Sequence, residues 1–138
     1  TYEALGQLER TLALRREVYT KQRVLAPEHP RALMSALNLA NSLCVTAQFT
    51  DAAALVNETL PIARRICGDA HDITLGLRFL LTRSIVLNPD TTQEDLRGAK
   101  EEAESLLRTT RRVFGTSHPR VELVRTLLKN ASDRLSLR

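Results

Sequence analysis

The sequence has few of the residues that β-rich folds depend on. Its 138 residues include no Trp, and aromatic residues make up 4% of the chain, beside five Gly and five Pro. Sandwiches and barrels need strand-forming aromatic residues and frequent Gly and Pro turns. The composition therefore favours an Ala- and Leu-rich helical array, and the length is that of one domain.

Long hydrophobic runs and cysteine motifs are also absent. No stretch approaches the roughly 18 apolar residues of a membrane span, and the first residues, TYEALGQLER, lack the apolar core of a signal peptide. The chain begins at Thr1 without Met, so we expect a fragment or a processed product. Cys44 and Cys67 have no CxxC spacing. We expect both to be reduced in an intracellular, cytoplasmic protein, with a disulfide or an organelle interior as the alternatives.

Three histidines are the residues that most readily suggest chemistry, and each stands in a short loop of the same kind. His29, His71 and His118 are 42 and 47 residues apart, a period typical of helical repeats. Because equivalent residues of an array are displaced by one repeat each, they cannot converge on one ion, and we expect each to hydrogen-bond a helix end. No nucleophile motif or phosphate-binding glycine loop is present. We expect no enzyme activity, no metal and no cofactor. The three loops are Ala26–Pro30, Gly68–Asp72 and Gly115–Pro119.

Between the first two loops, apolar residues recur with helical spacing on two successive stretches. The first stripe follows the i, i+3, i+4, i+7 pattern of one helix face, and a second begins after a short turn. Neither helix can bury its stripe alone, so each unit must pack against the next. The stripes are Ala36, Leu39, Ala40 and Leu43, then Ala52, Leu55, Val56 and Thr59.

This unit resembles the tetratricopeptide repeat, in the longer form seen in kinesin light chains. The family pattern of Leu and a small residue in the first helix is met by Leu39 and Ala40, its aromatic at the turn by Phe49, and its early Ala of the second helix by Ala52. The resemblance implies an all-α, right-handed superhelix of about six antiparallel helices. The expected units are a half-repeat at 1–29, repeats at 30–71 and 72–118, and a terminal helix at 119–138.

The second repeat departs from the first at two places. Arg78 stands where Ala36 stands one repeat earlier, so we expect looser packing or an outward-pointing guanidinium. The turn around Asn88–Thr92 is five residues longer than its counterpart. For the helix starts, side-chain oxygens predict caps at Thr50, Asp72 and Thr92.

The net charge of +4 and the pI near 9.6 raise the question of nucleic acid. Two arginine pairs, Arg64-Arg65 and Arg111-Arg112, fall in the last turns of equivalent predicted helices, where cations complement the helix dipole by roughly 0.3–1 kcal/mol each. Most of this positive charge therefore has a structural explanation. We expect a protein or peptide partner rather than nucleic acid, with no membrane span.

The resemblance places a binding surface on the concave side, along the outward row of each first helix. With Ala36, Leu39, Ala40 and Leu43 buried, that row begins at Met34 and recurs on the later helices at Gly76, Leu87, Leu123 and Thr126 among others. Asn amides there can grip an extended peptide backbone through donor and acceptor, and arginines attract acidic groups. Packing between helices is the competing explanation for the same side chains. The family's Lys/Arg clamp for a terminal carboxylate is not reproduced. The expected groove residues are Met34, Leu37, Asn38, Asn41, Val45, Phe79, Arg83, Asn130 and Arg134.

Two functions are favoured at this point, ahead of a third, a basic nucleic-acid binder. The first is an interaction module or scaffold that holds a peptide or partner segment in the concave groove. The second is a non-catalytic structural subunit, packed into a larger multiprotein complex through its open helical ends. An N-terminal half-repeat favours the second, because it leaves the apolar row of Leu5, Leu8 and Leu12 without a neighbour on one side.

Overall fold

The computed structural model describes residues 2–25 and 28–137, so Ala26 and Pro27 of the first histidine loop lie outside the described residues. Every regular element within them is an α-helix, as predicted. The six helices are α1 (Tyr2–Leu25), α2 (Pro30–Val45), α3 (Phe49–Cys67), α4 (Asp72–Leu87), α5 (Gln93–Phe114) and α6 (Pro119–Ser136).

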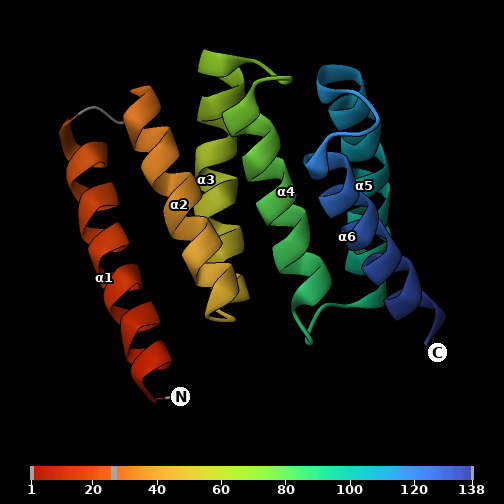
Figure 1. Cartoon of the computed structure of the whole chain (residues 1–138), viewed down its shortest axis with the longest axis horizontal. Helices are drawn as coiled ribbons and strands as arrows, with labels where there is room; N and C mark the ends of the chain where they lie inside the picture. The colour runs from red at the N-terminus through yellow and green to blue at the C-terminus, as the bar shows by residue number, and fades with distance from the viewer. Residues whose placement is uncertain (1, 26–27, 138) are drawn as a thin grey trace.

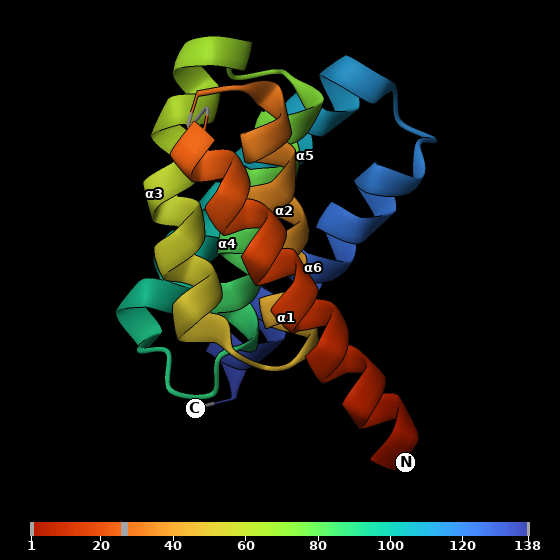
Figure 2. The ribbon, with the colours of Figure 1, turned by 90° about the vertical axis from the view of Figure 1, so that its left-hand side faces the viewer.

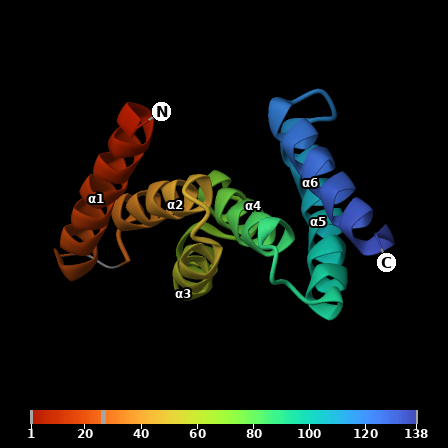
Figure 3. The same cartoon turned by 90° about the horizontal axis from the view of Figure 1, so that it is seen from below.

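The helices run antiparallel to their chain neighbours and follow one another across the molecule (Figure 1). Each packs on the next one along the chain, and α4 also contacts both α2 and α6. Seen from below, α2 and α4 lie between α1 and the α5–α6 pair, with α3 on one side of them (Figure 3). The helices α2, α4 and α6 therefore form one continuous layer, and α3 and α5 support it from behind.

The predicted stripes form the core. Ala36 and Ala40 of α2 and Ala52 of α3 are fully buried, which lets the two backbones approach closely. Isolated helices of this length are marginal in water, so their stability depends on this packing. The residues at the other stripe positions are buried as well, namely Leu39, Leu43, Leu55, Val56 and Thr59, as are Leu96, Ala99, Ala103 and Leu106 of α5.

The three histidines cap the three helices of the continuous layer, which confirms the predicted role. The Nδ1 of His29 accepts the backbone N–H of Arg31 at 3.0 Å. His71 accepts from Ile73 at 3.1 Å, and His118 accepts from Arg120 at 3.1 Å. Each ring satisfies one of the N–H groups that a helix start leaves without a partner.

The caps of the other helix starts were predicted with mixed success. Thr92 caps α5, its hydroxyl accepting the N–H of Asp95 at 3.1 Å as predicted. Thr50 was the wrong choice for α3, because the helix already begins at Phe49 and Gln48 precedes it without a side-chain cap bond. Asp72 was also wrong, because it is the first residue of α4 and the histidine before it provides the cap.

The helix ends use backbone conformations that favour glycine. Gly68 and Gly115 end α3 and α5 with φ of 91° and 86°, and each donates its N–H to the carbonyl four residues back. At the end of α2, Ala47 takes the same left-handed region with φ of 59°. The N–H of Gln48 reaches the carbonyl of Leu43 at 2.7 Å. This is the hydrogen-bond pattern of a Schellman motif, with alanine at the position where glycine is usual.

The predicted conflict at Arg78 is resolved neither by looser packing nor by an outward-pointing guanidinium, but by an ion pair. Arg78 is only 8% exposed, so its guanidinium does not point outward. Its Nε donates to Oε1 of Glu102 on α5 at 2.9 Å, and its Nη2 lies 2.9 Å from the same oxygen. An ion pair between α4 and α5 therefore occupies the position that Ala36 takes in the first repeat.

Helix α1 is the least buried of the six. Arg15 donates to Asn38 O and Ser42 Oγ of α2, and Arg23 pairs with Glu58 of α3. The N-terminal half of α1 points away from its neighbours (Figure 2), so that Leu12 is buried whereas Leu5 and Leu8 are 52% and 40% exposed. The apolar row predicted on this helix is thus covered only in part.

Candidate functional site

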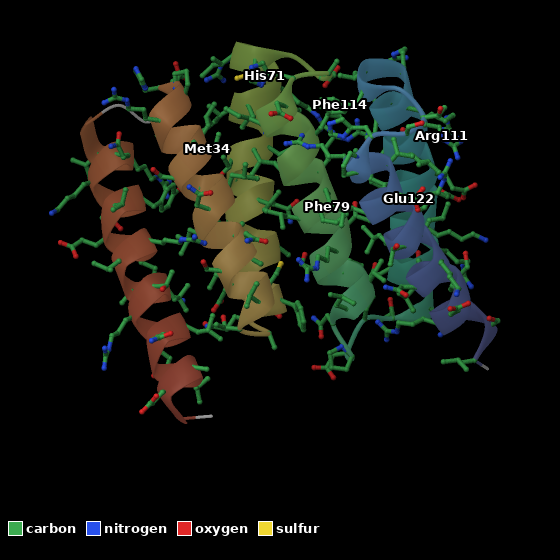
Figure 4. All side chains as sticks on the ribbon, viewed as in Figure 1. Met34, His71, Phe79, Arg111, Phe114 and Glu122 are labelled. Carbon is green, nitrogen blue, oxygen red and sulfur yellow. The ribbon has the colours of Figure 1, made fainter. Side chains whose placement is uncertain are left out.

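An apolar pocket of about 280 Å³ opens on the layer formed by α2, α4 and α6. Its floor is made by leucines and by two aromatic rings, Phe79 and Phe114, which lie in the space between α4 and α6 (Figure 4). The pocket is lined by Leu37, Asn38, Asn41, Leu75, Gly76, Phe79, Leu80, Leu106, Thr110, Phe114, Arg120, Leu123 and Val124.

Four of the predicted groove residues meet at this pocket. Leu37 and Phe79 are half-buried in its wall, and Asn38 and Asn41 are exposed at its rim. In the described part of the chain, neither Asn side chain makes a hydrogen bond to another residue. Their amides are therefore available to an incoming ligand. The absence of a side chain at Gly76 keeps the pocket open, because a Cβ there would lie 3.1 Å from a methyl group of Leu37.

Four other predicted residues lie outside the pocket lining. Met34 and Val45 are exposed on α2, and Met34 lies well apart from the two aromatic rings (Figure 4). Asn130 is exposed on α6. Arg83 is half-buried on α4, and within the described residues it makes no ion pair or hydrogen bond. These side chains flank the pocket on the same layer without forming part of its wall.

Arg134, the last predicted groove residue, uses its guanidinium to hydrogen-bond the end of α4. Its Nη1 donates to the carbonyls of Val86 and Asn88 at 2.7 and 2.8 Å, and its Nη2 lies 3.5 Å from the carbonyl of Pro89. These carbonyls are left without partners where the helix ends. The guanidinium therefore holds α6 against α4, and we leave Arg134 out of the proposed binding surface.

Two side chains that shape the pocket, those of Arg120 and Phe114, were not among the predicted groove residues. The guanidinium of Arg120 lies 5.1 Å from the centre of the Phe114 ring and pairs with Asp72 of α4. The same ring stacks on His118, with ring centres 4.6 Å apart. The available signal was an aromatic residue four positions before the third histidine, where the second loop has Cys67.

A buried thiol lies close to this surface. Burial raises the pKa of the Cys44 thiol, and the nearby positive charge of Arg83 opposes that rise. Cys44 and Cys67 are both free, as predicted.

The opposite, convex side has a second depression, of about 440 Å³, between α3 and α5. The Arg78–Glu102 pair lies at its wall together with Leu81 and Ile85 of α4. Helix α4 is thus bordered by a cavity on each side.

Two kinds of site are absent from the part of the chain that the structure describes. Within residues 2–25 and 28–137, no three His, Cys, Asp or Glu side chains are grouped so that they could hold a metal ion. None of the helices, over the same residues, combines the length and the apolar character needed to cross a membrane.

The arrangement of paired helices with a histidine-closed loop agrees with the comparison to known families. The family model of the tetratricopeptide repeat matches residues 32–72. Residues 32–72 form a tetratricopeptide repeat. The matched segment begins in the first turn of α2, includes all of α3 and ends at the first residue of α4. Tetratricopeptide repeats generally mediate protein–protein interaction. Searches among curated proteins and among solved structures gave no match.

Proposed function

We propose that this chain binds an extended segment of a protein partner on the face formed by α2, α4 and α6. The observation that carries the proposal is the apolar pocket whose rim presents Asn38 and Asn41, both with unoccupied amides. An amide side chain can donate to and accept from a peptide backbone at the same time. A ligand held in this way needs no regular structure of its own.

The pocket and the charge beside it indicate what such a segment carries. A bulky apolar side chain would fill the space between Leu37, Phe79 and Leu123, and burial of such a side chain contributes about 1.5–3 kcal/mol. Arg83 is a cation without an ionic partner in the described residues, and it favours an acidic residue near the anchor. Arg120 contributes less charge, because Asp72 already pairs with it.

The test is affinity capture from cell extract, with quantitative mass spectrometry of the captured proteins. The wild-type chain is compared with an Asn41→Ala/Arg83→Glu variant and with a matched Asn57→Ala/Arg108→Glu control, which makes the same chemical changes at exposed positions of α3 and α5. We expect a partner that wild type and control retain and that the groove variant loses. Equal helical circular dichroism of the three chains excludes unfolding as the cause.

The alternative function, assembly through the open ends, is favoured by one observation on α1. Leu14 and Val18 are 62% and 49% exposed on this helix. If the groove variant captures the same proteins as the wild type, the groove is not the binding site. Loss of capture by a Leu14→Lys/Val18→Lys variant would then assign binding to this flank.

A further inference from the structure

We propose that the three histidine caps make the face formed by α2, α4 and α6 sensitive to protons. All three rings use Nδ1 as the acceptor of a backbone N–H. A neutral imidazole accepts at one nitrogen only, so each ring must carry its hydrogen on Nε2. A proton added to Nδ1 occupies the lone pair that the cap requires, and the hydrogen bond is then lost.

The position of these rings makes the loss larger than that of one hydrogen bond. A helix start carries the positive end of the helix dipole, so an imidazolium there is repelled. Asn, Asp, Ser or Thr would keep their acceptor across the range near pH 6.5, where an ordinary histidine titrates. A histidine cap therefore makes the stability of the helix start depend on pH.

The charged groups around the caps do not compensate an added proton. Each nearby carboxylate is already in an ion pair with an arginine, as the contacts of the three loops show. His118 also follows the two arginines that end α5, Arg111 and Arg112, which add positive charge to that end of the array. The paired carboxylates are Glu28 with Arg65, Asp69 with Arg64, Asp72 with Arg120, and Glu122 with Arg125.

The caps stand at the starts of the three helices that carry the pocket residues. His118 has the most direct connection, because its ring stacks on Phe114 and its cap bond fixes the N–H of Arg120, and both of these residues line the pocket. Loss of the caps would loosen the first turns of α2, α4 and α6 together. The consequence for ligand binding rests on the proposed function, whereas the change in helix stability does not.

The first measurement determines the tautomers of the wild-type chain by ¹⁵N chemical shifts of its imidazoles at pH 7.5. We expect the Nε2–H form at all three rings. Amide hydrogen exchange then compares the three capped N–H groups, of Arg31, Ile73 and Arg120, at pH 7.5 and pH 5.5, after correction for the intrinsic pH dependence of exchange. Their protection should fall by about fivefold or more, the typical effect of one lost cap. A ring with its hydrogen on Nδ1, or unchanged protection, overturns the proposal.

The second measurement compares urea unfolding of the wild type with that of a triple variant, His29→Asn/His71→Asn/His118→Asn. Asn caps helices well and does not titrate. The unfolding equilibrium of the wild type should shift toward the unfolded state by roughly 100-fold between pH 7.5 and pH 5.5, if three caps of about fivefold each are lost. The triple variant should shift much less, because Asp and Glu titrate mainly below this range. An equal shift in both chains refutes the proposal. If the triple variant does not fold, the single His118→Asn variant serves in its place, and it should lose about one third of the logarithmic shift.

Discussion

The ion pair between Arg78 and Glu102 allows a quantitative test of how the second repeat is held together. The side chain of Arg78 is 9% exposed and that of Glu102 is 40% exposed, so water reaches the acid but hardly the base. Removing a partner from a fully buried pair costs about 3–5 kcal/mol, whereas an exposed pair contributes at most about 1 kcal/mol. For Glu102→Ala we therefore expect an intermediate loss of about 2 kcal/mol in the free energy of unfolding.

Substitution of the other partner, Arg78, by an apolar residue should cost much less stability. Arg78→Met removes the charge and keeps an apolar stem of similar length in the same space. Replacing a buried ionic side chain by an apolar one of similar volume is often close to neutral, so we expect a change within about 1 kcal/mol. In the Arg78→Met background, Glu102→Ala should then cost no more than about 0.5 kcal/mol, because no buried cation remains to be left alone.

Urea unfolding, followed by circular dichroism at 222 nm, gives the free energy of unfolding of the wild type, of the two single variants and of the double variant. The free energies are comparable only if the slope with urea stays constant, since a changed slope reports a changed denatured or native state. If Glu102→Ala alone costs less than about 0.5 kcal/mol, the pair does not stabilise the contact between α4 and α5. If both single variants lose 2 kcal/mol or more, the ion pair itself stabilises the contact between α4 and α5, and an apolar side chain does not replace it.

Four further predictions concern single positions. Ala47→Gly should stabilise the chain by about 0.5–1 kcal/mol in urea unfolding, because the residue has a φ of 59°. Gly98→Ala should also raise stability, by up to about 1 kcal/mol, whereas Gly76→Ala should gain less because its Cβ would lie 3.1 Å from Leu37. Cys44 should react with a thiol reagent at least about tenfold more slowly than an unfolded thiol at pH 8, because burial raises its pKa. By the same linkage, the free energy of unfolding should fall as the pH rises above the ordinary thiol value of 9.0, since the unfolded chain then releases this proton first.

Regular features of the fold could be predicted because they repeat in the sequence. The histidine loops and the stripe of Ala36 to Leu43 determine the helix boundaries to within a residue or two, and the core follows from the same spacing. Helix starts were harder to predict. Asp72 is a good capping residue by propensity, yet His71 one position earlier provides the cap, because both side chains offer an acceptor and only the backbone conformation decides between them.

The binding surface could be predicted only in part, for a different physical reason. Asn38 and Asn41 share one helix face with Leu37, so their approach to one another follows from helical periodicity. Arg134 lies at a similar register of α6, but its long side chain finds carbonyls at the end of α4. Arg120 and Phe114 come from different helices and meet only through the packing of α5 on α6. Contacts of this kind depend on the angle between helices. The spacing of residues within one helix does not predict that angle.

The two departures of the second repeat have a common consequence for the proposed site. The longer turn before α5 and the Arg78–Glu102 pair both lie where α5 meets α4, and a depression of about 440 Å³ opens there between α3 and α5. On the other side of the same helix, Gly76 and Phe79 border the pocket of about 280 Å³. Among the described residues, α4 and α5 both line the two cavities, and the Arg78–Glu102 pair joins these two helices. The ion pair on the convex side therefore helps to fix the shape of the pocket on the concave side, and a change at Glu102 should alter ligand affinity without touching the groove.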